Sequence, residues 1–475
     1  MFAICWREQR GTLSPRRRLD SSHRPRLIAQ AAGVLTAPAL LLLLSGCAAG
    51  SGGPRIAPLN PPAPKADSGK PINIRGNVVD STNHRPIQLA HVSYNQQVIS
   101  SDASGGFSFS GVPSNQTLTV VASGYGRYNA VWNPSRAQIG LTPLEVRGLY
   151  MPFAGLDDPT ILATIDRYTL NTEINSVVLE VKTDDGEVST QMATPAAIES
   201  RAVVGGYDVK GFIQRMHERN IYVVGRFVVF RDPALAKAHP EYALKRPSNG
   251  QPFADEQGEK WIDAFRQEVW QYNLDLAEKA AQLGLDEIQF DYVRFPGTDQ
   301  PLDYAELMTE DNRIAAISGF LKRAEGRLRP YGIAISADTF GLTTVATDDT
   351  GIGQDIASLG SFIDYYCPMV YPSTWADGSL GVAYPPAEPY TIVYDSVQSA
   401  VRRLANVPTV KVRPWLQAFD DYKRRQLDYT PDKINIQKDA SVKAGGTGWM
   451  LWDPASRYPA GAIGPSERSS APALR

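Results

Sequence analysis

The 475-residue sequence predicts an α/β protein, with a (β/α)8 TIM barrel over residues 147–456 and a small N-terminal all-β sandwich over residues 72–145. Two observations predict this fold. In the first region, short alternating or β-branched runs are separated by Gly, Asn and Asp turns, as in a β-sandwich. After Val146, apolar strands alternate with helical segments eight times in about 310 residues. That length fits one barrel better than two doubly wound domains.

The first 47 residues are expected to be a lipoprotein signal peptide. A basic stretch, residues 16–26, precedes an apolar run over residues 31–44 that is too short for a comfortable membrane span. The run ends in Leu-Ser-Gly-Cys47, which resembles the lipobox of bacterial lipoproteins, where the cysteine is acylated. Lipidation at Cys47 would anchor the protein to a membrane in the bacterial cell envelope, outside the cytoplasm. An uncleaved anchor helix is the alternative.

Two further segments are expected to lack a fold of their own. Residues 48–71 are rich in Gly, Pro, Ala and Ser and predict a flexible linker, and residues 457–475 predict a disordered tail. Signal cleavage would remove Cys5 and lipidation would use Cys47, which leaves Cys367 as the only free thiol. No intramolecular disulfide is therefore expected.

The sandwich region carries a recognisable pattern in residues 76–80, 101–105 and 122–125, which read GNVVD, SDASG and ASGY. This pattern resembles the carboxypeptidase-regulatory-like domain. The resemblance implies a β-sandwich and says little about function, because such modules usually serve as spacers or binding attachments.

Eight apolar or β-branched runs are expected to form the barrel strands. They are residues 149–151, 176–182, 221–230, 285–293, 333–338, 365–371, 409–417 and 448–453. Helices are expected from Asp208, over residues 265–283 and over residues 314–328, where apolar side chains recur every three or four residues. The extra length after the third strand (231–264) and after the sixth (372–390) predicts long loops around a binding cleft.

Carboxylates close several of these strands, and in TIM barrels the working groups lie at the C-terminal strand ends. Asp291, Asp338 and Glu180 are therefore the candidate catalytic residues. Neighbouring strands lie about 4.8 Å apart, so Asp291 and Asp338 can face one site. Two carboxyl groups flanking one bond are what glycoside hydrolysis requires. The alternative is interior ion pairing, of Glu180 with Lys182 or Arg226 and of Asp291 with Arg294.

Polar and aromatic side chains beside these acids are the candidate substrate-binding residues. They are Lys182, Asp184, Arg226, Arg294, Tyr371, Trp415, Gln417, Trp452 and Asp453. Tryptophan faces near strand ends can stack on sugar rings, although such side chains more often belong to the core. Asp453 has a second interpretation, as a cap on the turn into Pro454.

Four segments together resemble one known family. They are residues 178–186 (VLEVKTDDG), 286–296 (DEIQFDYVRFP), 367–372 (CPMVYP) and 413–417 (RPWLQ). They are similar to the bacterial family of putative glycosyl hydrolase-like domains, long catalogued as domains of unknown function. The resemblance covers about 310 residues. It implies a TIM barrel related to the α-amylase-like and other glycosidase barrels, and a glycosidase without naming its sugar.

The same resemblance implies roles for the acids. The α-amylase-like group has its nucleophilic aspartate at the end of strand four and its acid at the end of strand five, which correspond to Asp291 and Asp338 here. The acid of that group is normally glutamate, so Asp338 departs from the pattern by one methylene. Glu180 is the reserve candidate.

Composition disfavours several other classes. The formal net charge of -2, from 48 basic and 50 acidic residues, offers no electrostatic case for nucleic acid. The five histidines are scattered, and neither a G-x-S-x-G elbow nor a Walker-type loop occurs, so no metal and no cofactor is expected. Two functions remain: a glycosidase acting on an extracytoplasmic poly- or oligosaccharide, or a lipoprotein that binds glycan without cleaving it.

Overall fold

The computed structural model describes residues 71–465. The predicted signal peptide, the lipidation site Cys47, almost all of the predicted linker and the last ten residues of the predicted tail lie outside the described residues. Among the residues that are described, no helix combines the length and the hydropathy that a membrane span requires.

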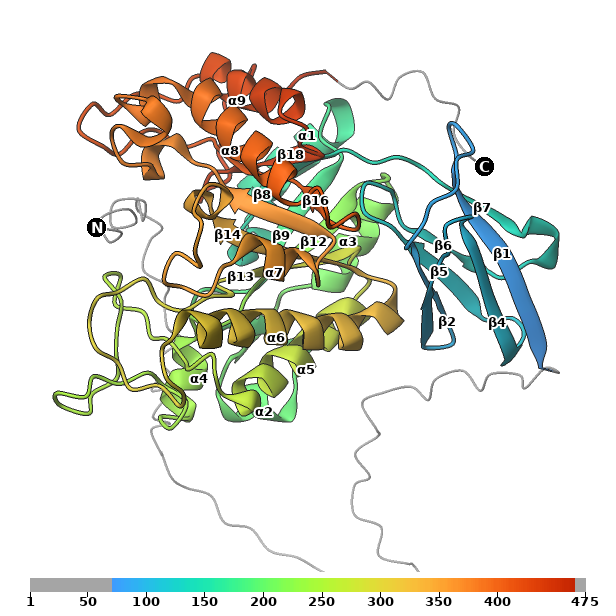
Figure 1. Ribbon diagram of the computed structural model, residues 1–475, viewed down its shortest axis with the longest axis horizontal. Helices are drawn as coiled ribbons and strands as arrows, with labels where there is room; N and C mark the ends of the chain where they lie inside the picture. Colours follow the sequence, from blue (N-terminus) through green and yellow to red (C-terminus); the bar gives the residue numbers. More distant parts are fainter. Residues whose placement is uncertain (1–70, 466–475) are drawn as a thin grey trace, which may run out of the picture. The chain divides into compact units, whose positions relative to one another are not determined.

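The N-terminal region consists of two β-sheets, drawn in blue and teal in Figure 1. One has the order β4 (Gly106–Val112), β1 (Ile72–Asp80) and β7 (Gln138–Leu141); the other has the order β3 (Gln97–Ser100), β2 (His91–Tyr94), β5 (Thr117–Val121) and β6 (Tyr128–Val131). Buried and exposed residues alternate along β1 and β4 because one face of their sheet is packed. Their buried side chains, such as Ile74 and Phe109, meet Val92 and Leu118 of the other sheet in one core.

Eight parallel strands form a closed barrel after this region, which confirms the predicted fold class (Figure 1). The barrel closes because β8 pairs with both β18 and β9. In barrel order the strands are β8 (Val146–Met151), β9 (Ser176–Lys182), β12 (Tyr222–Val228), β13 (Glu287–Asp291), β14 (Ala334–Phe340), β15 (Tyr365–Met369), β17 (Trp415–Gln417) and β18 (Gly448–Trp452). Each overlaps one of the eight strands expected from the sequence.

Helices follow the strands and bury their apolar faces against the barrel. The main ones are α1 (Pro159–Asn171), α3 (Val209–His217), α5 (Gln267–Gln282), α6 (Glu310–Leu328), α8 (Pro389–Arg403) and α9 (Pro431–Lys443). Asp208 caps α3 by accepting a hydrogen bond from the amide of Gly211. Phe265 lies outside the helix expected over residues 265–283, since α5 begins at Gln267 and Phe265 packs in the preceding loop against Phe295.

The seventh strand was predicted as one continuous run, and the structure divides it. It is divided into β16 (Lys411–Val412) and β17, with Arg413 and Pro414 between them. Pro414 has no amide hydrogen and cannot donate to the ladder, so the chain pairs on either side of it. The long loop after β12 contains α4 (Pro233–Ala238) and several isolated β-bridges, including one between Arg231 and Trp261.

The strand at the centre of the site, β13, sends three polar side chains into the barrel. Glu287, Gln289 and Asp291 alternate with apolar residues, as the period of two requires. Glu287 lies deepest and is ion-paired with Arg413, and Gln289 lies above it, with its amide 3.6 Å from the sulfur of Met450. Asp291 ends the strand and is the first of the three to reach the pocket.

Candidate active site

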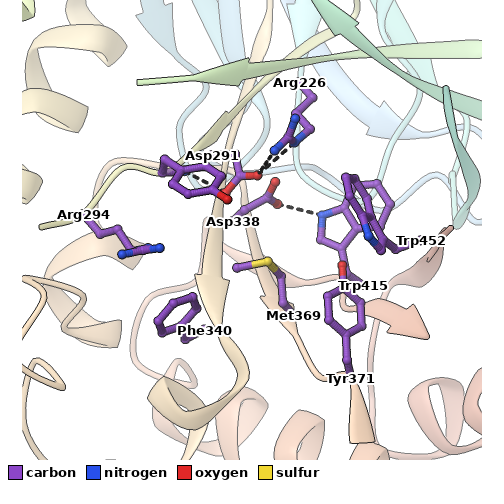
Figure 2. A pocket seen from close by; sticks show the side chains of 10 residues that line it. Arg226, Asp291, Arg294, Asp338, Phe340, Met369, Tyr371, Trp415 and Trp452 are labelled. Atoms are coloured by element: carbon purple, nitrogen blue, oxygen red, sulfur yellow. Dashed lines mark hydrogen bonds and ion pairs between the residues drawn. The ribbon is translucent and has the colours of Figure 1, made fainter. Parts of the chain in front are cut away.

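A pocket lies at the C-terminal ends of the barrel strands, where TIM barrels carry their sites (Figure 2). Its lining comes from strands β12, β13, β14, β15, β17 and β18 and from the segments that follow β13 and β15. The lining residues are Arg226, Asp291, Tyr292, Arg294, Asp338, Phe340, Met369, Tyr371, Trp415 and Trp452. Seven of these ten were candidate site residues from the sequence.

Arg226 organises the carboxylates on one side of the pocket. Its guanidinium lies 2.5 Å from Glu180 Oε1, 3.0 Å from Asp184 Oδ1 and 2.6 Å from Asp291 Oδ2. Its Nε also donates to Asp291 at 2.8 Å. A buried arginine with a forked pair of donors is a strong partner for carboxylate and favours its ionised form. Asp291 is therefore ion-paired with Arg226, and not with Arg294 as the alternative from the sequence assumed.

Asp338 is the second acid of the pocket and lies next to Asp291 in Figure 2. Its side chain is 2% exposed, and the indole Nε1 of Trp415 donates to its Oδ1 at 2.8 Å. Burial raises the pKa of Asp338 well above its usual range, and the nearby Asp291 raises it further, while Arg226 and Trp415 act in the opposite direction. These effects together favour the protonated form of Asp338, which lies beside an Asp291 that is ion-paired with Arg226.

Glu180 is buried and does not line the pocket. Its Oε2 accepts a hydrogen bond from the amide of Phe153 at 3.1 Å, and its Oε1 faces Arg226. Burial raises the pKa of Glu180 to about 7, against the opposing effect of Arg226. Glu180 thus positions Arg226, and the ion pair proposed for it from the sequence is present.

Asp184 connects the pocket to the long loop after β12. It accepts from Arg226 and also lies 3.0 Å from Nη1 of Arg231. Arg231 in turn contacts Asp255 of the loop at 3.1 Å and donates to the hydroxyl of Tyr292. The long loop therefore fixes the rim of the site through charged contacts.

The aromatic side of the pocket is formed mainly by Trp415, Trp452 and Tyr371. The two indole rings meet edge to face, with centroids 5.6 Å apart. Trp415 and Trp452 are only 1% and 7% exposed. Their rings form a wall of the pocket and are not projecting platforms on which a sugar could stack fully.

Three lining residues, Tyr292, Phe340 and Met369, were not predicted from the sequence. Phe340 follows Asp338 by two residues on β14, so strand alternation could have found it. Tyr292 has a left-handed backbone with φ of 50°, and its amide donates to Asp291 Oδ1 at 2.7 Å. A non-glycine residue in this region is strained, and no sequence pattern signals it here.

Three further predicted substrate contacts, Lys182, Gln417 and Asp453, do not line the pocket. Lys182 is fully buried, with its Nζ 2.8 Å from Asp232, because a register shift between β9 and β12 turns it away from the face of Glu180. Gln417 is also buried and donates to Ser373 Oγ at 2.8 Å. Asp453 accepts from the amides of Ala455 and Arg457, which is the turn-capping role.

Within residues 71–465, no cluster of three or more His, Cys, Asp or Glu side chains is arranged to hold a metal ion. The thiol of Cys367 is free and fully buried in the barrel, beside Arg413. The chemistry available in the pocket is that of its carboxyl groups, arginines and aromatic hydroxyls.

The fold and the site define an α/β barrel with a paired acid and carboxylate at the C-terminal strand ends. Residues 148–458 match the model of the family described as "Putative glycosyl hydrolase domain". This match spans well over half of the 475 residues, and the chain belongs to that family.

Solved structures similar to this chain include a hypothetical protein from Ruminiclostridium thermocellum, with 34% identity over 40% of this chain and 96% of that chain and a TM-score of 0.35. The glycoside hydrolase domain of PgaB (BpsB) from Bordetella bronchiseptica has 14% identity, covering 66% of this chain and 95% of that chain, with a TM-score of 0.48. That of PelA from Pseudomonas aeruginosa has 12% identity, covering 66% and 96%, with a TM-score of 0.38. The sequence matches no curated protein.

Proposed function

We propose that this protein is a glycoside hydrolase that cleaves an extracytoplasmic poly- or oligosaccharide with Asp338 as the acid and Asp291 as the nucleophile or base. One observation carries the proposal: a buried Asp338, whose pKa burial raises, shares a pocket with an Asp291 that is ion-paired with Arg226. Environments that separate the protonation states of two neighbouring carboxyl groups are what assigns acid and base roles in glycosidases.

The reaction would use the two groups in sequence. The proton of Asp338 passes to the glycosidic oxygen as the bond between that oxygen and the anomeric carbon breaks. Asp291 can take a proton from the water that attacks the anomeric carbon. Alternatively, it attacks that carbon itself to form a glycosyl ester, and water that gives a proton to the Asp338 carboxylate then hydrolyses the ester and frees Asp291. Trp415 fixes the orientation of Asp338, and Arg226 fixes that of Asp291, so both acids are positioned before substrate binds.

The proposed location is the cell envelope, with the chain anchored through acylated Cys47. The proposal rests on the basic stretch, the short apolar run and the Leu-Ser-Gly-Cys47 motif. The N-terminal sheets are proposed to be a carboxypeptidase-regulatory-like module that acts as a spacer or binding attachment.

The test is turnover of a glycan panel by the full chain and by Asp291→Asn. Asp291→Asn should reduce hydrolysis of the best substrate by at least about 100-fold and retain binding, because general acid-base or nucleophilic catalysis contributes at least that much. The matched control is Asp439→Asn, at an exposed position on α9, which should behave as the wild type. Binding without turnover by the wild type would contradict the proposal and favour a non-catalytic glycan-binding protein.

A further inference from the structure

Arg294 is held at the edge of the pocket by aromatic rings. Its guanidinium carbon lies 4.7 Å from the ring centroid of Trp261, 5.1 Å from that of Tyr292 and 4.5 Å from that of Phe340. Figure 2 shows its guanidinium end directed into the pocket, beside Phe340. Packing against three rings fixes the side chain, so little conformational freedom remains to be lost when a ligand binds.

The hydrogen-bonding capacity of Arg294 is largely unused. Its Nη1 donates to the carbonyl of Phe295 at 2.9 Å. Within residues 71–465, no carboxylate lies within 4.0 Å of its guanidinium. A guanidinium has five N–H donors in a fixed fork, so most of the fork of Arg294 is available to the pocket.

Three other buried arginines, unlike Arg294, are paired with carboxylates. Arg226 faces three carboxylates, Arg231 faces Asp184 and Asp255, and Arg413 faces Glu287. Each of these cations is neutralised inside the protein, as buried charges normally are. Arg294 is only partly buried, lines the pocket and has no carboxylate within ion-pair distance among residues 71–465.

Distant charges do not compensate Arg294 fully. Asp291 and Asp255 act on it from beyond ion-pair distance, and Arg231 opposes them. Burial nevertheless lowers the pKa of Arg294 to about 10, so burial outweighs the combined attraction. The side chain is still a cation at neutral pH, and an anion in the pocket would supply the missing partner.

We propose that Arg294 binds an anionic group of the glycan, so that the substrate is an acidic polysaccharide or oligosaccharide carrying uronate carboxylates or sulfate esters. Both groups offer paired oxygens to the forked donors of arginine. The inference rests on the proposed glycosidase function and gives it a substrate class. It makes Arg294 a specificity residue, with catalysis left to Asp291 and Asp338.

The experiment compares matched glycans that differ only in charge. One pair is a uronate-containing polysaccharide and its carboxyl-reduced form, and the other is a sulfated polysaccharide and its desulfated form. Affinities are measured by calorimetry on the full chain in the Asp291→Asn background, where the substrate is not consumed, and rates are measured with Asp291 intact.

Arg294→Met keeps an apolar chain against the three rings and removes the charge, whereas Arg294→Lys keeps the charge and removes the fork. Arg402→Met, on the exposed side of α8, is the control.

The expected result is a preference of the parent protein for the charged member of one pair, lost in Arg294→Met by about 10- to 100-fold, the range expected for a hydrogen-bonded charged contact. The preference of Arg294→Lys should lie between those of the parent protein and Arg294→Met. Arg402→Met should keep the preference of the parent. The pair that shows the effect identifies carboxylate or sulfate as the group bound.

Two results would overturn the inference. One is equal binding of charged and neutral partners by the parent protein, which requires no variant to fold. The other is an equal loss for charged and neutral glycans in Arg294→Met. Turnover of neutral glycans in either case would leave the glycosidase proposal standing, whereas charge-selective binding without any turnover would support the role of Arg294 and contradict catalysis.

Discussion

Strand β13 carries two acids on the same inward face, and the protein treats them differently. Glu287 and its partner Arg413 are both 0% exposed, and Glu287 also accepts from Ser336 and, at 3.1 Å, from the hydroxyl of Tyr222. Asp291, four residues along, is also paired with an arginine but lies in the pocket beside Asp338.

The difference between the two acids shows what makes a carboxylate suitable for chemistry. Pairing with arginine is common to both and does not distinguish them. Only Asp291 lines the pocket and lies beside a second acid, Asp338, whose pKa is raised by burial. We infer that the ion pair of Glu287 and Arg413 stabilises the barrel. Asp291 and Asp338, in the pocket, are inferred to serve the reaction.

Arg413→Met is expected to have the largest effect, and the effect should be on stability. It would leave Glu287 charged, buried and without its cation, which typically costs about 3–5 kcal/mol. Urea denaturation of wild type and variant gives the difference in the free energy of unfolding. A loss in the free energy of unfolding below about 1 kcal/mol would contradict the structural role inferred for the ion pair between Glu287 and Arg413.

Asp338→Asn should have the opposite profile, with a large effect on rate and a small one on stability. The amide oxygen can still accept from Trp415, but the side chain no longer has an acidic proton to give. Hydrolysis of the best substrate should fall by at least about 100-fold, or about 2.7 kcal/mol in the activation free energy. Retained activity with an unchanged pH profile would exclude Asp338 as the acid.

Glu180→Gln should change the pH dependence of stability. The folded-state pKa of Glu180 is raised from 4.5 to about 7, so the folded protein retains a proton that the unfolded chain releases between these values. This group therefore lowers stability as pH rises from 4.5 to about 7, and the penalty is complete above that pH. The unfolding free energy of Glu180→Gln relative to the wild type should accordingly increase across this window. A difference that is independent of pH would contradict the assignment.

Asp453→Ala is expected to have the smallest effect. Loss of the two amide hydrogen bonds to Asp453 should lower stability by about 1 kcal/mol, as for other caps, and leave the rate unchanged. Thermal unfolding and a rate assay measure both quantities. A selective loss of glycan affinity would restore the sequence-based interpretation of Asp453 as a substrate ligand.

The sequence predicted the barrel because strand and helix periodicities differ and repeat eight times, and it predicted Asp291 and Asp338 because both close apolar strands. The sequence could not predict that the side chain of Lys182 turns away from the pocket, because the register shift between β9 and β12 depends on how the two strands pair. The left-handed backbone of Tyr292 was hidden for a similar reason, since tertiary contacts impose it. Which arginine pairs with which acid likewise depends on three-dimensional packing.

The protonation state of Asp338 beside Asp291 can be measured without any substrate. A protonated carboxylic acid gives a carbonyl band in the infrared spectrum. Comparing the folded wild type with Asp338→Asn and Glu180→Gln at neutral pH would assign this band to one of the two residues. We predict a band at pH 7 that disappears in Asp338→Asn and persists in Glu180→Gln. Identical spectra of the wild type and Asp338→Asn in that region would show Asp338 to be ionised at neutral pH and would rule it out as the acid.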